Sequence, residues 1–137
     1  MKQRISPLNP PGVAAPIRSY YSNAYRVEAG PLLFIAGQVP IDVNGNLVGD
    51  GDAGAQAEQV FANIEAILKG AGGSLSDLVK VLVFVTDFAD LPQITAVRAR
   101  LFPKDGPASS VIEVKALINP RMKVEIEAVA AIGASGA

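Results

Sequence analysis

Apolar residues along the chain follow two different spacings, and these spacings predict strands alternating with helices. The runs 32–36 and 78–85 are almost unbroken in apolar residues, which is typical of strands buried on both faces. From Ala55 onward, apolar residues recur every three or four positions, as they do on one face of a helix. The predicted strands are 19–28, 32–36, 78–85, 109–114 and 123–132, and the predicted helices are 55–69 and 91–102.

Turn and capping residues separate these elements. Asp52 and Asp90 stand where the N-caps of the two helices are expected. The Ala-Gly-Pro turn at 29–31 is expected to join the first two strands into a hairpin. Asn44 and Gly45 form a strong two-residue turn signal, so a smaller hairpin is expected around them.

The order of the elements predicts an α+β fold, in which two amphipathic helices cover one face of a mixed β-sheet. The length fits a single domain, 1–137, and its proline-rich start, 1–16, is expected to be an extended arm. Strands 32–36 and 78–85 lack a polar face, so a single copy would expose apolar surface to water. We therefore expect copies of the chain to associate through their sheets.

Composition narrows the chemistry that the protein can perform. The sequence contains no Cys, His or Trp, which excludes thiolate nucleophiles, Cys/His zinc sites and histidine-based triads. Its 12 basic and 13 acidic residues are near balance, so no basic surface for nucleic acid or acidic membranes is expected. No segment has the apolar length of a membrane span or of a secretory signal, which predicts a cytoplasmic protein.

Three short motifs resemble functional sites but have simpler interpretations. The G-x-G-x-x-G pattern at 49–54 follows a turn and not a strand, so it is expected to be a loop. The acidic loop that starts at Asp42 lacks the glycine and glutamate of a calcium loop. Arg98, Arg100 and Lys104 form a basic cluster that we interpret as a solvated helix face. We expect neither a metal nor a cofactor.

Several stretches, taken in order, carry a more specific signal. They are 21–24 (Tyr-Ser-Asn-Ala), 34–40 (Phe-Ile-Ala-Gly-Gln-Val-Pro), 81–87 (Val-Leu-Val-Phe-Val-Thr-Asp), and 107–114 (Pro-Ala-Ser-Ser-Val-Ile-Glu-Val) followed by 124–128 (Val-Glu-Ile-Glu-Ala). Together they resemble the RidA/YjgF family of reactive-imine deaminases, whose members have also carried endoribonuclease names. The resemblance covers nearly the whole chain from Tyr20. It implies a chorismate-mutase-like fold and a homotrimer with a central barrel, with small-molecule clefts between adjacent subunits.

The resemblance also implies roles for single residues. In the deaminases of that family an arginine binds the substrate carboxylate, while a glutamate and a backbone carbonyl position the water that attacks the imine carbon. By position, Glu125 corresponds to the glutamate and Val111 supplies the carbonyl. Tyr21 corresponds to the tyrosine at the mouth of the cleft.

The chain departs from the family pattern at three of the implied cleft positions. Ser109 stands at the position of the arginine, Ala36 replaces the serine that usually precedes Gly37, and Thr95 replaces an asparagine on the second helix. A hydroxyl offers one donor and no charge, so Ser109 cannot take the place of a bidentate guanidinium.

Two hypotheses of different classes stay open. The first is a hydrolytic deaminase for an altered imine or enamine, with Glu125 orienting water and another cation, such as Arg18 or Arg121, binding the acid group. The second is a non-catalytic relative that binds a small metabolite between subunits or acts through a protein partner. A cationic side chain that reaches the cleft near Ser109 and Glu125 would favour the first, and a cleft blocked by side chains would favour the second.

The balanced charge leads to a first testable prediction. Without a basic stripe, the protein should show no salt-sensitive affinity for RNA, because such affinity depends on cations that displace counterions from phosphates. Fluorescence anisotropy with a labelled single-stranded RNA measures this directly. Tight binding that weakens steeply with added salt would contradict the prediction and favour a ribonuclease.

Overall fold

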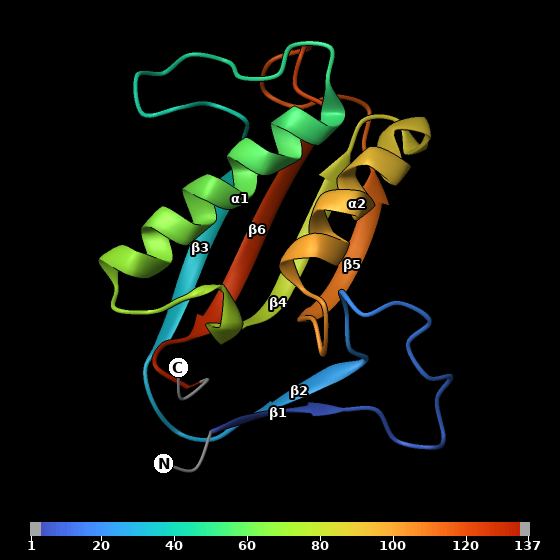
Figure 1. Ribbon diagram of the computed structural model, residues 1–137, viewed down its shortest axis with the longest axis vertical. Coiled ribbons are helices and arrows are strands. Elements are labelled where there is room, and N and C mark those ends of the chain that lie inside the picture. Colours follow the sequence, from blue (N-terminus) through green and yellow to red (C-terminus); the bar gives the residue numbers. More distant parts are fainter. Residues whose placement is uncertain (1–3, 135–137) are drawn as a thin grey trace.

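A four-stranded sheet forms the middle of the molecule, and two helices cover one of its faces (Figure 1). The computed structural model describes residues 4–134. The strands of the sheet lie in the order β3-β6-β4-β5, with β4 and β5 parallel and the other neighbours antiparallel. The elements are β1 (Ile5–Leu8), β2 (Ala24–Val27), β3 (Leu32–Gln38), α1 (Ala53–Gly70), β4 (Leu78–Val85), α2 (Leu91–Leu101), β5 (Ala108–Glu113) and β6 (Val124–Ala131), with short 3-10 turns η1 (Leu75–Asp77) and η2 (Phe88–Asp90). The predicted α+β class is confirmed.

The core lies between the helices and the two central strands, β4 and β6. Because side chains alternate across a strand, every second residue points to the helices. These residues are buried and make up one apolar cluster with the inner faces of both helices: Val81, Val83, Val85, Val124, Ile126, Ala128 and Ala130. The intervening residues, such as Lys80 and Glu125, point to the other face, which we call the open face of the sheet.

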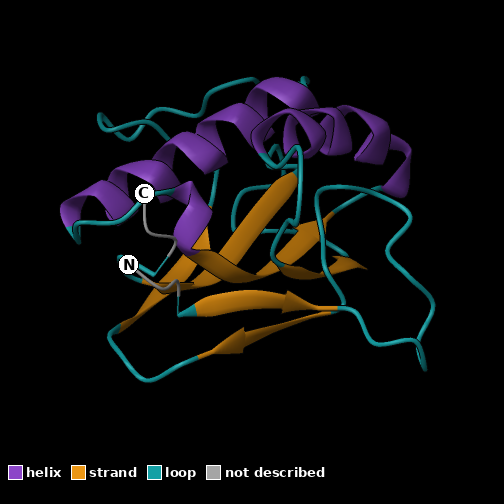
Figure 2. Cartoon of the chain, turned by 60° about the horizontal axis from the view of Figure 1, so that its bottom comes forward, coloured by secondary structure: helices purple, strands orange, loops and turns teal. Residues whose placement is uncertain are grey.

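Helix α1 packs on β3 and β6, and its ends follow the sequence signals closely. The carboxylate of Asp52 accepts a hydrogen bond from the Ala55 amide at 3.0 Å, which confirms the predicted N-cap. The Phe61 ring of α1 packs edge-on against Phe102 at the end of α2, with ring centroids 5.8 Å apart. Figure 2 shows both helices in one layer over the sheet. Within residues 4–134, neither is long and apolar enough to cross a membrane.

The predicted cap of the second helix is wrong. The Asp90 side chain makes no capping bond, because its backbone is already helical and an N-cap needs extended backbone. Its carboxylate instead accepts from the Lys123 ammonium at 3.3 Å. Asp87 does the capping one turn earlier, since its side chain accepts from the Ala89 amide and starts η2.

The predicted hairpin between strands 19–28 and 32–36 is also wrong. Of the first segment only β2 is a strand, and it pairs with β1, which lies in the segment expected to be an extended arm; β3 pairs with β6. The Arg4 guanidinium holds the connection between β2 and β3 by donating to the carbonyls of Glu28 at 2.9 Å and Pro31 at 2.5 Å. Pro7 within β1 is tolerated because a two-stranded pair leaves one edge of each strand free.

The loop between β3 and α1 contains the predicted tight turn. Gly45 has φ +83°, a conformation that favours glycine, and its amide donates to the Asp42 carbonyl at 3.0 Å. The Asp42 carboxylate accepts from the amides of Asn44 and Asn46, so this side chain closes the turn.

The open face of the sheet is strongly apolar for a surface in contact with water. Phe34 is 74% exposed and Ile112 is 45% exposed, and Leu82, Phe84 and Val129 are half-buried on the same face. This is the apolar second face that the sequence pattern predicts. An exposed apolar patch of this kind marks an interaction surface, and the homotrimer remains our prediction for what covers it.

Replacing Phe34 tests that assembly. Light scattering at micromolar concentration should give about three times the chain mass for the native protein. Phe34→Glu should dissociate it, because a buried carboxylate without a partner is costly. Val43→Glu is the matched control, since Val43 is 98% exposed in the loop and a charge there should leave the mass unchanged. A native protein that stays monomeric would contradict the prediction.

Candidate functional site

A carboxylate lies against the backbone of β3 where that strand is irregular. The register between β3 and β6 shifts between Ile35 and Gln38, so Ala36 and Gly37 lie in a bulge. A Cβ atom added to Gly37 would lie 2.7 Å from Oε1 of Glu125 and 2.9 Å from its Cδ. Glycine is therefore the residue that lets the Glu125 carboxylate approach this backbone.

Glu125 has no charged partner in the described part of the chain. It is half-buried on the open face, and no ion pair or hydrogen bond joins its carboxylate to another group within residues 4–134. The nearest cation in sequence, Lys123, is engaged by Asp90. A half-buried carboxylate that is free of cations can accept a proton or a hydrogen bond from a small molecule.

Ala36 lines a hollow on the open face of the sheet, and Glu125 is not among the residues that line it. The hollow has a volume of about 450 Å³, and Phe34, Lys80 and Glu127 also line it. Because the open face is the predicted contact between copies, whatever occupies the hollow would lie at that contact.

Val111 presents its backbone to the free edge of the sheet. The Val114 amide donates to the Val85 carbonyl at 2.8 Å, so even-numbered residues of β5 direct their backbone groups toward β4. The odd-numbered Ser109, Val111 and Glu113 therefore direct theirs outward, since successive residues of a strand alternate. β5 is an edge strand, so the Val111 carbonyl faces away from the sheet.

A buried arginine reaches Ser109 from helix α2. Nη2 of Arg98 donates a hydrogen bond to the Ser109 Oγ at 2.6 Å, and the guanidinium lies over the Tyr20 ring, 4.8 Å from its centroid. Arg98 is only 1% exposed. Burial lowers the pKa of Arg98 to about 10, and the neighbouring Tyr20 opposes that shift. The group is still a cation at neutral pH.

The solvated basic cluster expected on α2 is therefore wrong for Arg98, although Arg100 is exposed and pairs with Glu58. A signal for burial was present in the sequence, because Arg98 follows Ile94 by four residues and so shares its buried stripe. Arginine side chains are usually exposed to solvent, so the charge of Arg98 led to the prediction of a solvated position despite this spacing.

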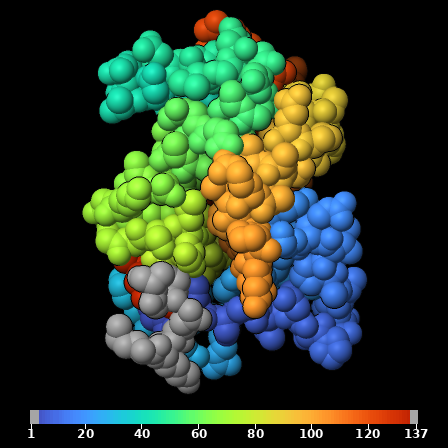
Figure 3. All heavy atoms as spheres, in the orientation of Figure 1, coloured from blue at the N-terminus to red at the C-terminus, as the bar shows by residue number. Residues whose placement is uncertain are grey.

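Close backbone packing holds Tyr20 over this arginine. A Cβ atom on Gly106 would lie 2.1 Å from the Tyr20 carbonyl carbon and oxygen, so glycine is required there. The Gly106 amide donates to the Ser19 carbonyl at 2.9 Å, and the Ser22 amide donates to the Pro107 carbonyl at 3.3 Å. Figure 3 shows this N-terminal arm, in blue, packed beside the orange end of α2.

The other predicted site residues lie in different places. Tyr21 and Arg18 line one cavity of about 280 Å³, together with Lys104 and Asp105, but Ser109 and Glu125 do not line it. The Tyr21 hydroxyl accepts a hydrogen bond from the Ile17 amide, and the Thr95 hydroxyl donates to the Pro92 carbonyl of its own helix. Arg121 forms an exposed ion pair with Asp50 at 3.0 Å. Neither Arg18 nor Arg121 bonds to Ser109 in the described chain; Arg98 does.

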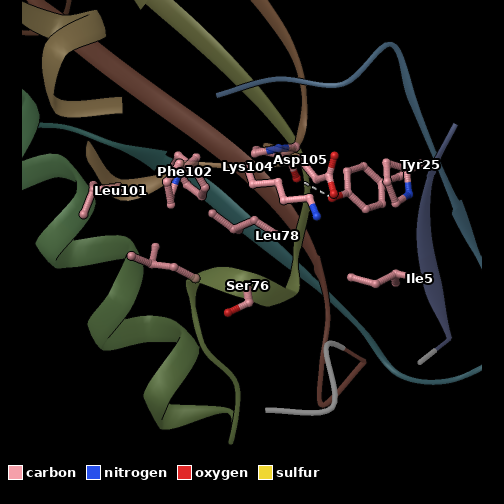
Figure 4. Close-up of a pocket in the computed structure, with 12 residues that line it drawn as sticks. Ile5, Tyr25, Ser76, Leu78, Leu101, Phe102, Lys104 and Asp105 are labelled. Atoms are coloured by element: carbon pink, nitrogen blue, oxygen red, sulfur yellow. Dashed lines mark hydrogen bonds between the residues drawn. The ribbon is translucent and has the colours of Figure 1, made fainter. Parts of the chain in front are cut away.

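A further cavity lies between the β1–β2 pair and the end of α2 (Figure 4). Its volume is about 430 Å³, and Ile5, Leu78 and Phe102 give it apolar walls. The Tyr25 hydroxyl donates to the Asp105 carbonyl at 2.5 Å. Burial and, to a smaller degree, the Asp105 charge raise the pKa of Tyr25, so its hydroxyl stays protonated and is a poor base. Within residues 4–134 no cluster of three acidic side chains could hold a metal ion.

One chain does not bring Glu125 and Ser109 together. Ser109 faces the helices, because Arg98 of α2 bonds to it, whereas Glu125 points to the open face. Two strand positions also separate them, since β4 lies between β5 and β6. A site that uses both would have to combine the edge of one copy with the open face of another.

Comparisons with known proteins point to one family. A profile of the endoribonuclease L-PSP family matches residues 13–132. A RutC family protein of Pyrococcus horikoshii is 41% identical over 95% of this chain and 98% of its own length. The 3-aminoacrylate deaminase RutC of Acinetobacter baylyi is 36% identical over 88% of this chain and 93% of its own. Among solved structures, the Rid family protein YyfB of Yersinia pestis, of unknown function, has a TM-score of 0.87 at 35% identity and covers 94% of this chain and 99% of its own.

The contact between Gly37 and Glu125 can be tested by a double-mutant cycle. Gly37→Ala should lower the free energy of unfolding by about 1–3 kcal/mol, the usual cost of overpacking. In a Glu125→Ala background the same change should cost much less, because the carboxylate that the new methyl group meets is gone. Gly70→Ala, with open space around its Cβ position, is the control. Urea unfolding measures all four variants, and equal costs in both backgrounds would refute the contact.

Proposed function

Because this chain belongs to the endoribonuclease L-PSP family, the family of the Rid and RutC proteins, we propose that it hydrolyses a small imine or enamine acid to an oxo acid and ammonia. The reaction would take place in a site that two copies of the chain form together. This is the first of the two hypotheses that the sequence left open.

The state of Glu125 is the observation that carries the proposal. A carboxylate acts as a general base only if it is ionised and within reach of water, and an ion pair would occupy it. Glu125 is held against Gly37, half-buried and without a cation among the described residues. A purely structural glutamate would be expected to pair with Lys123, which instead binds Asp90.

The chemistry that this carboxylate would perform is a two-step hydrolysis. Glu125 takes a proton from water while the oxygen of that water adds to the imine carbon, and the imine nitrogen is protonated. In the resulting carbinolamine, Glu125 returns its proton to the amino group, the carbon–nitrogen bond breaks and ammonia leaves. The hydroxyl proton passes to solvent as the carbonyl forms, which balances the proton that the imine nitrogen took from solvent. An enamine first becomes the imine by gaining a proton at carbon and losing one from nitrogen.

The Val111 carbonyl is suited to hold the water during this reaction. Within residues 4–134 no strand pairs with the outer edge of β5 at Val111, and a backbone carbonyl can accept a hydrogen bond from water. Since Glu125 lies on the opposite face, we propose that Val111 of one copy works with Glu125 of another. The apolar open face, with Phe34 exposed, supplies the contact that would bring two copies together.

The relatives and the charges support a small acid as the proposed substrate class. A relative of which this chain covers most of the length is named a 3-aminoacrylate deaminase, and 3-aminoacrylate is a small enamine acid. Recognition of such an acid needs a cation near the site, and the buried guanidinium of Arg98 adjoins Ser109. A neutral or cationic substrate would leave that charge without a partner.

Replacing Glu125 tests the proposed reaction. An imine acid generated in the assay from an amino acid by an oxidase should disappear faster with the native protein than by spontaneous hydrolysis, with matching ammonia release. Glu125→Gln should slow this by about a hundredfold or more, because an amide cannot take the proton. Glu127→Gln is the comparison variant: Glu127 lies on the same strand and face and lines the hollow, but it is not held against Gly37, so its replacement should reduce the activity much less.

The outcomes separate the two hypotheses. Native protein that does not accelerate imine or enamine hydrolysis would favour the non-catalytic binding protein. Equal losses in the Glu125 and Glu127 variants, with the oligomer intact by light scattering, would show that the role of Glu125 is not chemical.

A further inference from the structure

We propose that Arg98 is the group that binds the carboxylate of the substrate or product, and that helix α2 thereby supplies the cation that the resemblance places on strand β5. This inference rests on the proposed function for its substrate class. It adds a specificity-determining residue that neither the sequence motifs nor the relatives indicate.

Arg98 is a buried cation that lacks a counter-charge among the described residues. Arg98 is 1% exposed, yet no carboxylate among the described residues pairs with it, and its Nε has no hydrogen-bond partner. Burying a charge without an opposite charge destabilises a folded protein, so such a group is seldom kept for packing alone. A bound anion would supply both the charge and the acceptors that are missing.

The contact with Ser109 orients the Arg98 guanidinium. One N–H of the guanidinium donates to the Ser109 hydroxyl at 2.6 Å, and the Tyr20 ring covers a face of the group. These contacts fix the orientation of the fork and leave other N–H groups for a planar acceptor, and a carboxylate is the acceptor that this fork fits best.

Ser109 and Arg98 depend on each other. An arginine at 109 would bring a second guanidinium to the place where Arg98 already lies, and two like charges in a buried site repel each other. A serine there is small and accepts the hydrogen bond of the helix arginine. The cation is thus moved from strand to helix and not lost.

Arg98 and Ser109 lie near the edge of β5 that carries the Val111 carbonyl. Ser109 lies two residues before Val111 on the same strand and the same face, so the guanidinium adjoins the edge that carries the proposed water-binding carbonyl. Thr95 lies one helical turn before Arg98 on α2, on the same side of the helix.

Binding of a stable oxo acid tests the inference without relying on turnover. The probe is pyruvate, and methyl pyruvate is its uncharged counterpart. Calorimetric titration of the native protein should detect pyruvate and no comparable affinity for the ester. Arg98→Met should weaken pyruvate binding by about tenfold or more, the usual effect of losing a charge-assisted contact. Arg100→Met, on the same helix but paired with Glu58 at the surface, should bind pyruvate as the native protein does.

A second pair of variants tests the exchange of position. Ser109→Arg alone should not raise pyruvate affinity, because the new cation meets Arg98. The double variant Ser109→Arg/Arg98→Met, which keeps one guanidinium, should recover most of the affinity that Arg98→Met loses. If Arg98→Met does not fold, Arg98→Lys serves instead: it keeps the charge but not the fork, and should bind pyruvate severalfold more weakly.

Binding measurements can also contradict the proposed role of Arg98. A native protein that binds no pyruvate, or that binds its methyl ester equally well, would overturn the inference, as would a folded Arg98→Met protein with native affinity. Failure of the proposed reaction is a separate result: a protein that binds pyruvate through Arg98 but does not hydrolyse imines would keep this inference and lose the deaminase activity.

Discussion

The buried guanidinium of Arg98 is the constraint around which one end of the molecule is organised. Arg98 lies on the inner face of α2, so the residue opposite it on β5 must be small and able to accept a hydrogen bond. Ser109 does both, because its hydroxyl accepts from the guanidinium. Tyr20 covers the group, and Gly106 allows the arm that carries Tyr20 to pack closely enough. Among the described residues no carboxylate neutralises this charge, and a buried charge without a partner is costly unless a bound ligand supplies one.

The second feature, Glu125 against Gly37, belongs to the opposite face of the same sheet. Within one chain the sheet therefore separates Arg98 from Glu125. Two copies could bring them together, because β5 lies at an edge of the sheet and the open face is apolar. Assembly and chemistry are linked in this view, because the surface that is unfavourable in water is also the surface that carries the carboxylate.

Much of the fold could be predicted from the sequence, and the failures have physical causes. The helices and the strands at 78–85 and 123–132 follow from apolar periodicity, because their burial is one-sided or complete. The pairing of β1 with β2 could not be predicted from the sequence. Pro7 argues against a strand at 5–8, and the choice of partner strand depends on contacts between distant residues, such as Arg4 with Pro31. The family resemblance named Glu125 and Ser109 as candidate site residues. Arg98 was expected to be solvated, because its charge outweighed its place on a buried stripe.

A crystal structure of the protein with pyruvate bound tests the central claim most directly. The account predicts that the carboxylate of the ligand forms paired hydrogen bonds with the Arg98 guanidinium of one copy, and that Glu125 of a neighbouring copy lies close to its carbonyl carbon. Pyruvate held by Arg18 or Arg121, or a ligand bound within one chain far from both Arg98 and Glu125, would contradict it.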